Sequence, residues 1–392
     1  MQAAPFCFAP ATQEIKSPRC YSEIMRVGAG GILCTFLLFC ASLFTTKADA
    51  RNYRQALAGG IRTLQTWYSP PTGLYTTTGW WNSANAITVL VNAMRVSGST
   101  KYAPIVANTF AAAQRTRAGF LNEYYDDEGW WALAWIDAYD LTKKPQYLSM
   151  AESIFADMAG GWDDGVCGGG IWWSKKRTYK NAIANELFLS VAAHLANRAS
   201  DPREKAQYLM WAHREWRWFR ASGMQNSQNL INDGLNSKNP SACVNNGQTT
   251  WSYNQGVVLG GLVELSRADG DAGLLTTAHS IADAALLRLT DARGILHDAC
   301  EPRCGADGVQ FKGIFVRNLM ALNDASPQQR YKTFIEANAD SILANAQGKD
   351  YEFGQVWSGP FDGANAGTQS SALDALVARL SYRATGNAEA LL

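Results

Sequence analysis

The sequence predicts an all-α fold, an (α/α)6 barrel in which six helical hairpins close into a ring. Two kinds of helical segment alternate strictly after residue 50: one is amphipathic and charged, and the other is apolar nearly all round, as in GVVLGGLVEL (256–265). The apolar segments begin about 57 residues apart, which is enough for two helices of about four turns and their loops. This repeat exceeds the 34–47 residues of common open α-solenoids, so a closed ring is favoured over a solenoid.

Each hairpin pairs one helix of each kind. Because a helix that is apolar on all sides must be buried on all sides, we expect the apolar helices inside the ring and the amphipathic helices outside. The expected outer helices are Asn52–Trp67, Lys101–Arg115, Gln146–Ala159, Arg203–Ser222, Ala272–Leu289 and Gln328–Ala346. The expected inner helices are Asn82–Val96, Asp127–Leu141, Lys180–Ala196, Thr250–Ser266, Lys312–Leu322 and Thr368–Leu380.

The composition excludes several classes of protein. The 392 residues include 35 Lys+Arg and 34 Asp+Glu, and a net charge of +1 excludes a polybasic nucleic-acid binder. With 47% hydrophobic and 18% charged residues, the chain is not intrinsically disordered. The 14 Trp are more than a core needs, since each buried indole N–H requires a hydrogen-bond acceptor.

Residues 1–50 are typical of a secretory leader. Lys16, Arg19 and Arg26 precede an apolar run of 13 residues (32–44), and Ala-Asp-Ala at 48–50 offers a cleavage site. We therefore expect a secreted or cell-wall-associated protein with one catalytic domain, 51–392. An uncleaved signal anchor in the membrane is the alternative.

Four cysteines follow the leader, and an even number in an oxidising compartment indicates two disulfides with three possible connectivities. Cys300 and Cys304 are close enough in sequence to pair, which leaves Cys167 for Cys243. No C-x-x-C spacing occurs and the chain has only 4 His. We therefore expect neither a metal site nor a cofactor.

Aromatic residues cluster where the inner helices begin, and in a closed ring these beginnings share one end. Such an end forms a groove with flat stacking platforms, which suits the C–H faces of sugars. The residues concerned are Trp80, Trp81, Tyr124, Tyr125, Trp130, Trp131, Trp172, Trp173, Trp251, Tyr253, Phe311, Trp357 and Phe361.

Two adjacent carboxylates, Asp126 and Asp127, stand at the expected start of the second inner helix. Backbone geometry there permits a carboxyl separation near the ~5–5.5 Å of retaining glycosidases. The helix N-terminus favours ionisation of one carboxyl, while the charged neighbour and apolar rings favour the protonated form of the other. A pair of acids capping the helix is the alternative interpretation.

The segment YYDDEGWWALAWIDAYDLT (124–142) resembles the signature of glycoside hydrolase family 76, the α-1,6-mannanases and their fungal wall-remodelling relatives. Four further segments resemble the same family in order and extend the likeness over residues 52–385: GWDDGVCGGGIWW, YKNAIANELFL, TWSYNQGVVLGGL and FKGIFVRNL. The resemblance implies that Asp126 is the nucleophile and Asp127 the acid/base, acting on α-1,6-linked mannose.

The candidate substrate-binding residues combine the aromatic cluster with nearby amides and one lysine. Core packing is the alternative for Trp131 and Trp251, and Lys312 either contacts a sugar or pairs with a carboxylate. The full set is Trp81, Tyr125, Trp131, Trp173, Asn181, Trp251, Tyr253, Asn254, Gln255 and Lys312.

The expected function is a secreted, endo-acting, retaining α-1,6-mannosidase. A transglycosidase needs the same two carboxylates, so it remains an alternative, as does a non-catalytic mannan-binding protein. The expected partner is a polysaccharide, α-1,6-mannan or a mannoprotein glycan. We expect a monomer, with no nucleic acid and no stable membrane partner.

Overall fold

The computed structural model describes residues 52–236 and 243–389, with side chains as far as residue 382. The predicted leader lies outside the described residues, so its function and cleavage stay predictions. The unit Ala50–Leu392 contains every described helix.

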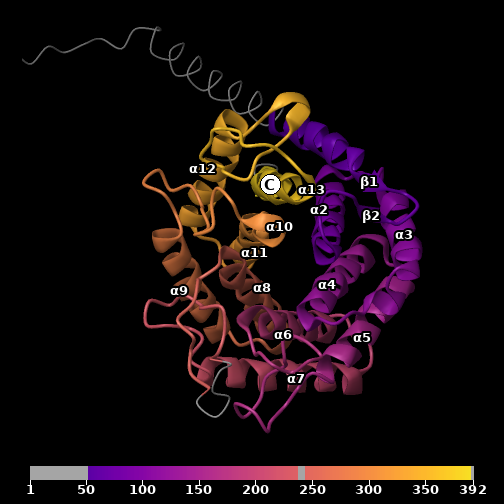
Figure 1. Cartoon of the computed structure of the whole chain (residues 1–392), viewed down its shortest axis with the longest axis vertical. Helices are drawn as coiled ribbons and strands as arrows, with labels where there is room; N and C mark the ends of the chain where they lie inside the picture. The colour runs from indigo at the N-terminus through magenta and orange to yellow at the C-terminus, as the bar shows by residue number, and fades with distance from the viewer. Residues whose placement is uncertain (1–51, 237–242, 390–392) are drawn as a thin grey trace, which may run out of the picture. The chain divides into compact units, whose positions relative to one another are not determined.

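The inner wall of this unit is a closed ring of six of the described helices, which Figure 1 shows from one end. Each inner helix contacts the next, and the last contacts the first, so that no helix edge is left open. The ring therefore confirms the predicted (α/α)6 architecture. Its members are α2 (Trp80–Ser97), α4 (Tyr125–Thr142), α6 (Ala182–Ala196), α8 (Ser252–Asp269), α11 (Phe311–Ala325) and α13 (Ala366–Glu389).

The amphipathic helices form the outer layer, and each packs its apolar face on the inner ring. Their ends, like those of the inner helices, agree with the predicted ranges to within three residues, except that α13 runs on to Glu389. The outer helices are the helix over residues 52–66, α3 (Ala103–Ala112), α5 (Pro145–Ala159), α7 (Pro202–Ala221), α9 (Gly273–Arg288) and α12 (Gln329–Asn345).

Short elements connect these helices. The described residues include a small hairpin of two strands that pair antiparallel, three 3-10 turns and a four-residue helix before α11. These elements are β1 (Tyr68–Ser69), β2 (Leu74–Tyr75), η1 (Ala113–Arg115), η2 (Ala118–Phe120), η3 (Lys349–Tyr351) and α10 (Gly305–Gly308).

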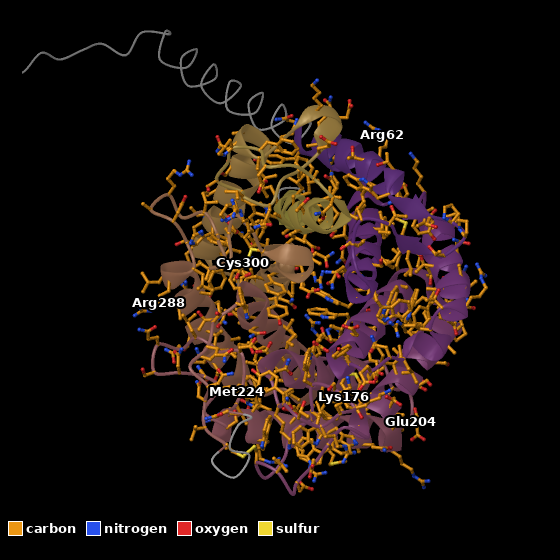
Figure 2. The ribbon with its side chains drawn as sticks, viewed as in Figure 1. Arg62, Lys176, Glu204, Met224, Arg288 and Cys300 are labelled. Atoms are coloured by element: carbon orange, nitrogen blue, oxygen red, sulfur yellow. A yellow bond between two sulfur atoms is a disulfide. The ribbon has the colours of Figure 1, made fainter. Side chains whose placement is uncertain are left out.

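Burial separates the two layers as the hydrophobic pattern predicts. In α6, every residue except His194 is buried. Charged side chains such as Arg62, Glu204 and Arg288 lie on the outside of the ring (Figure 2). Two glycines permit close approach of inner helices: a Cβ on Gly256 would lie 2.6 Å from Cα of Phe315, and one on Gly313 would lie 2.5 Å from the carbonyl oxygen of Ser371.

The two predicted disulfides are both present, Cys167–Cys243 and Cys300–Cys304. No helix in the described ranges is long and apolar enough to span a membrane. Within the same ranges, no group of three or more His, Cys, Asp or Glu side chains is placed to hold a metal ion.

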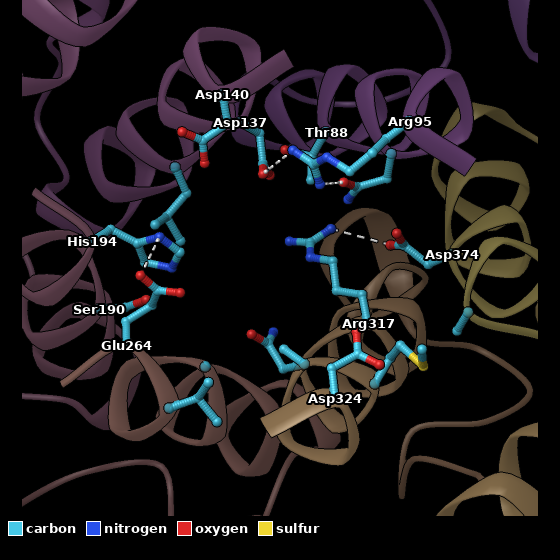
Figure 3. A pocket seen from close by; sticks show the side chains of 18 of the residues that line it. Thr88, Arg95, Asp137, Asp140, Ser190, His194, Glu264, Arg317, Asp324 and Asp374 are labelled. Atoms are coloured by element: carbon cyan, nitrogen blue, oxygen red, sulfur yellow. Dashed lines mark hydrogen bonds and ion pairs between the residues drawn. The ribbon is translucent and has the colours of Figure 1, made fainter. Parts of the chain in front are cut away.

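The end of the ring where the inner helices finish holds a cavity of about 410 Å³ lined by charged side chains (Figure 3). Arg198 contacts both Asp140 and Glu264, at 2.5 and 3.1 Å, and Arg317 lies 3.1 Å from Asp374. Each of the four arginines that line the cavity forms an ion pair with at least one carboxylate of the same lining. The paired charges are Arg95, Arg198, Arg267 and Arg317 with Asp137, Asp140, Glu264 and Asp374.

Candidate active site

Asp126 and Asp127 lie in the first turn of α4, at the end of the ring opposite the charged cavity. Backbone hydrogen bonds from a neighbouring loop hold this first turn of α4 in place. Tyr124 forms an isolated antiparallel bridge with Ser174, and the amide of Tyr125 donates to the carbonyl of Trp173 at 3.0 Å. The loop that enters α6 therefore holds the start of α4 and places Trp173 beside the two carboxylates.

Asp126 has one engaged and one free carboxylate oxygen. The indole N–H of Trp173 donates to Oδ2 at 3.0 Å, while Oδ1 is buried with no hydrogen-bond partner in the described part of the chain. Burial raises the pKa of Asp126 well above its ordinary range, and the charge of Asp127 raises it further. The hydrogen bond from Trp173 acts in the opposite direction and favours the charged form.

Asp127 accepts a hydrogen bond from Nδ2 of Asn122 at 2.5 Å. Burial raises the pKa of Asp127 to about 6, against the lowering effect of Asn122. The charge of Asp307 also raises this pKa, and the charge of Arg117 lowers it. A carboxyl group that titrates near pH 6 can donate and accept a proton under mildly acidic conditions.

The larger rise in pKa falls on Asp126, for which the resemblance implies the ionised role. Because the charge of one carboxyl disfavours ionisation of the other, the pKa values describe the pair as a unit and not either residue alone. The assignment of nucleophile and acid/base within the pair stays a prediction.

Glu128 supports the pair from the buried side of α4. Its Oε1 accepts from the amide of Asn122 at 3.1 Å and lies 3.0 Å from Nζ of Lys175, which also contacts Asp157 at 2.9 Å. Burial raises the pKa of Glu128 to about 8, while Lys175 favours its charged form. These contacts fix the loop that carries Asn122, and with it the hydrogen bond to Asp127.

Four aromatic rings from four inner helices pack together at this end of the ring. Tyr253 stacks on Phe311 with centroids 3.8 Å apart and lies 6.4 Å from Trp130. Trp81 stacks on Trp130 at 5.5 Å and on Phe311 at 6.4 Å. Trp130 and Phe311 are buried, and Trp81 and Tyr253 are half-buried. The cluster is therefore an aromatic floor with two partly open rings.

Two carboxylates that sequence reasoning missed also lie at this end. Asp233 accepts from the indole of Trp251 at 3.2 Å and from the hydroxyl of Tyr179 at 2.5 Å. Asp307 accepts from the indole of Trp81 at 2.9 Å. Both aspartates lie outside the long helices, where no periodicity marks them. The only signal was indirect: each indole N–H at the rim needs an acceptor.

The structure places four of the predicted binding residues, Trp81, Trp173, Trp251 and Tyr253, half-buried at the rim. The other six are buried. Asn181 caps α6, with its Oδ1 accepting from the amide of Ala184 at 3.3 Å.

Tyr125, another of these buried residues, is 5% exposed and packs against Gly161 under the ammonium group of Lys175. Asn181 and Tyr125 therefore support the rim loops, since neither has a side chain open to the groove.

The expected groove contact of Trp131 is wrong. Its side chain is 0% exposed and packs against Trp80, Phe120 and Trp135, with centroids 4.8–5.6 Å apart. The reason is helical phase: residues 130 and 131 point about 100° apart on α4. Trp130 faces the aromatic floor, and Trp131 faces the layer between the inner and outer helices.

The expected sugar contacts of Asn254, Gln255 and Lys312 are also wrong, because all three side chains are at most 2% exposed. Gln255 accepts from the amide and donates to the carbonyl of Ile231, at 2.8 and 2.9 Å, and so pins a loop to α8.

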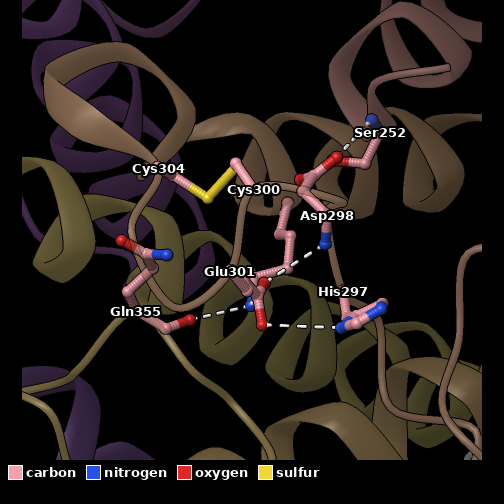
Figure 4. Close-up of a disulfide and its surroundings, with 8 residues drawn as sticks. Ser252, His297, Asp298, Cys300, Glu301, Cys304 and Gln355 are labelled. Carbon is pink, nitrogen blue, oxygen red and sulfur yellow. Dashed lines mark hydrogen bonds and ion pairs between the residues drawn. A yellow bond between two sulfur atoms is a disulfide. The ribbon is translucent and has the colours of Figure 1, made fainter. Parts of the chain in front are cut away.

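Lys312 takes the other option that the sequence left open and pairs with a carboxylate, that of Glu301. It also donates to the carbonyl of Gln355 at 2.7 Å, and the ring of Trp357 lies 4.7 Å away. Glu301 follows directly after Cys300 of the short disulfide (Figure 4). The lysine therefore anchors the loop that leads to α10.

A ring of helical hairpins with a carboxylate pair on an aromatic-lined end defines a glycoside hydrolase of the α/α-toroid class. A family model described as glycosyl hydrolase family 76 matches residues 46–390. The chain belongs to this family.

Relatives and solved structures agree with this membership. The chain is 28% identical over 279 residues to mannan endo-1,6-alpha-mannosidase DFG5 of Candida albicans, a match that covers 66% of this chain and 61% of that protein. It is 26% identical over 330 residues to mannan endo-1,6-alpha-mannosidase DCW1 of Saccharomyces cerevisiae, covering 76% and 71%.

Among solved structures, an inactive variant of the α-1,6-mannanase GH76A of Salegentibacter sp. HEL1_6 superposes with a TM-score of 0.75 at 22% identity, covering 84% of this chain and 99% of that one. Dfg5 from Chaetomium thermophilum superposes with a TM-score of 0.74 at 20% identity, covering 85% and 91%. These structures share the fold of this chain.

Proposed function

We propose that the protein is a secreted, endo-acting α-1,6-mannosidase that retains anomeric configuration through double displacement. The observation that carries the proposal is the Asp126–Asp127 pair. The two carboxyls are neighbours in the first turn of α4, one oriented by Trp173 and the other by Asn122, and burial raises the pKa of both. A retaining glycosidase needs such an arrangement, with one carboxylate to attack and one carboxylic acid to protonate.

In the first step, a carboxylate oxygen of Asp126 attacks the anomeric carbon as the bond from that carbon to the leaving oxygen breaks. The proton of Asp127 moves to the leaving oxygen, which departs as a hydroxyl. In the second step, Asp127 takes a proton from water, and the water oxygen displaces Asp126 from the anomeric carbon. The two inversions return the starting configuration, and both carboxyls return to their starting protonation.

The aromatic floor and its rim supply the binding face for the polymer. Trp81 and Tyr253 offer partly open rings beside the carboxylate pair. Indole and phenol rings pack well on sugar C–H faces and keep a polar edge for hydrogen bonding.

The substrate class rests on the relatives. The Salegentibacter structure is of an inactive variant with two consecutive aspartates replaced by alanine, in complex with an α-1,6-linked mannotetraose. A consecutive aspartate pair and an α-1,6-mannan ligand thus occur together on this fold. The proposal extends both to the present chain.

Secretion rests on the predicted leader and on cysteine chemistry. All four cysteines of the domain are in disulfides, which persist in oxidising compartments and are rare in the cytosol. N-terminal sequencing of the protein recovered from culture medium tests this part, with Arg51 expected as the first residue.

The catalytic proposal is tested with residues 51–392 and linear α-1,6-mannan, following the products by ¹H NMR of the anomeric protons. Internal cleavage with an α-configured first product is expected, and α-1,2-linked mannan serves as the control substrate. Adding an acceptor oligosaccharide shows which acceptor is used in the second step: hydrolysis yields free sugars, whereas transfer to a sugar hydroxyl yields a lengthened oligosaccharide. Tight binding of mannan without turnover would leave only a binding protein.

A further inference from the structure

The charged cavity where the inner helices finish has the size of a ligand pocket. Its volume is about 410 Å³, and small-molecule sites usually enclose about 300–1,000 Å³. All six helices of the inner ring contribute to its lining (Figure 3). The small residues Gly260, Ala321 and Ala378 stand in this lining and leave the space open. The cavity is separate from the active site, because its lining includes neither Asp126 nor Asp127.

The charges that line the cavity do not balance. Five carboxylates face four arginines, and each arginine already pairs with a carboxylate. The remaining carboxylate, Asp324, is exposed and forms no ion pair with any described residue. Burial lowers the pKa of His194, so its imidazole adds no charge near neutral pH. With its carboxylates ionised, the lining therefore carries one excess negative charge.

Asp374 presents an unused acceptor to this cavity. Its side chain is 3% exposed, and its Oδ2 accepts from Arg317 at 3.1 Å. Its Oδ1 is buried and has no hydrogen-bond partner among the residues that the structure describes. Figure 3 shows this carboxyl group at the wall of the cavity, where it points toward Arg317. Because a buried carboxylate oxygen without a donor is unfavourable, a donor on a bound molecule would stabilise it.

The unpaired groups define the chemistry of a ligand. An excess negative charge and a free carboxylate oxygen require a cation that donates hydrogen bonds. The described acids and histidines form no group of three or more that could hold a metal ion, whereas an ammonium group needs only separate acceptors. The side chains of Thr88 and Ser190 lie in the same lining, and their hydroxyls suit hydroxyl groups on the ligand.

We propose that this cavity is a second binding site, which takes a small organic amine that carries hydroxyl groups. The ammonium group donates to Oδ1 of Asp374, and the charge of Asp324 balances it. The ligand enters past the ends of α4, α6 and α8, where an adjoining pocket of about 380 Å³ shares Arg198 and Glu264 with the cavity. The site is independent of the proposed glycosidase activity.

The test is isothermal titration calorimetry of the purified protein with 1-amino-1-deoxysorbitol. Sorbitol is the matched neutral compound, since it differs only in a hydroxyl that replaces the ammonium group. Burial raises the pKa of Asp374 to about 7, while Arg317 lowers it and Asp137 raises it, so the titration is done at pH 8. We expect the amine to bind at one site at least about tenfold more tightly than sorbitol, the effect of a charge-assisted hydrogen bond. At pH 6, where Asp374 holds its proton, the amine should bind more weakly.

Asp374→Asn should weaken binding of the amine about tenfold, and Asp324→Asn about threefold, because the latter removes only a more distant charge. An asparagine at 374 still accepts from Arg317, and Asp324→Asn breaks no ion pair, so the second variant decides if the first fails to fold. Asp126→Asn, in the active site, and Glu204→Gln, exposed on α7, are controls that should leave the affinity unchanged.

Equal affinity for the amine and for sorbitol, or no detectable binding of the amine, would overturn the proposal. So would binding that Asp126→Asn abolishes and Asp374→Asn leaves intact, because the amine would then occupy the active site.

Discussion

The indole N–H of Trp173 donates to Oδ2 of Asp126 at 3.0 Å, and the other oxygen of this carboxylate has no partner among the described residues. One oxygen is thereby oriented by a hydrogen bond, and the other is buried without one in the described ranges. Because a hydrogen bond to the charged form lowers a carboxyl pKa, Trp173 also offsets part of the burial that raises the pKa of Asp126.

Replacing Trp173 with Phe should lower kcat/KM about tenfold to hundredfold, the value of a hydrogen bond to a charged group. The acidic limb of the pH profile should move upward, since Asp126 then ionises less readily. The matched control is Trp172→Phe, which removes an indole hydrogen bond of 3.1 Å to Asp163 instead. Equal losses of activity in the two variants would show that the effect is on folding alone.

Asp126→Asn should abolish turnover of every substrate, because no glycosyl-enzyme can form without the attacking oxygen. Asp127→Asn should spare the first step for substrates with very good leaving groups, which need no proton, and slow the second. Mass spectrometry should then detect a glycosyl group trapped on Asp126. A first product of inverted configuration would contradict both roles.

Trp131 and Trp251 should respond differently to replacement by Ala. Trp131→Ala should lower the free energy of unfolding by about 3–5 kcal/mol, the cost of removing a large buried side chain. Trp251→Ala should weaken binding of α-1,6-mannan oligosaccharides with a smaller loss of stability, because its ring is half-buried at the rim. Urea denaturation and calorimetry measure the two effects, and Trp251→Phe separates ring contact from the hydrogen bond to Asp233.

Glu264 should make the protein sensitive to acid. Burial alone would raise the pKa of its carboxyl, but the charges of His194, Arg198 and Arg267 outweigh it and lower the pKa to about 2. A folded-state pKa below the unfolded value stabilises the fold above about pH 4.5, and this stability is lost as pH falls toward 2.

Glu264→Gln should therefore cost about 1.5–3 kcal/mol at pH 7, because Arg198 and Arg267 lose a charged partner although Arg198 keeps Asp140, and much less at pH 2. Exposed Glu204 supplies the control, and Glu204→Gln should cost less than about 1 kcal/mol. Urea denaturation at several pH values gives the comparison, and a pH-independent cost for Glu264→Gln would contradict the shift.

The two disulfides should contribute unequally to stability. By chain entropy, Cys167–Cys243, which spans 76 residues, contributes about 4.5 kcal/mol, and Cys300–Cys304, which spans 4, about 2 kcal/mol. Serine pairs at 167/243 should therefore lower Tm more than serine pairs at 300/304. The shorter bridge should matter more for activity, since it holds α10. Peptide mapping without reduction that finds free thiols would contradict both bridges.

The helices could be predicted because their burial is periodic. The helices α6 and α8 carry apolar residues on all faces and must therefore be buried on all sides. This pattern can be recognised in the sequence without knowing which helices pack against them. The carboxylate pair was visible for a similar reason: Asp126 and Asp127 are neighbours in the chain, so their proximity needs no tertiary structure.

The remaining site residues depend on contacts between distant segments. Asp307 approaches Trp81 across 226 residues, and nothing local distinguishes it from a turn aspartate. Lys312 is at the start of α11, where a rim residue is expected, but its side chain is buried because its ammonium group pairs with Glu301 and lies over the ring of Trp357. Side-chain direction at a helix start depends on such partners, which a single sequence does not reveal.

The three indoles at the rim, Trp81, Trp173 and Trp251, each donate their only N–H to a protein carboxylate. What they can still offer a ligand is a flat hydrocarbon face, which cannot distinguish one epimer from another by its hydroxyls. Binding to such faces therefore depends on the shape of the polymer backbone. A side branch of the polysaccharide that projects away from the indole rings costs no affinity. A branch that separates the polysaccharide backbone from the rings prevents binding. Tolerance of decorated natural polymers is therefore governed by where the decoration points, not by how much of it there is.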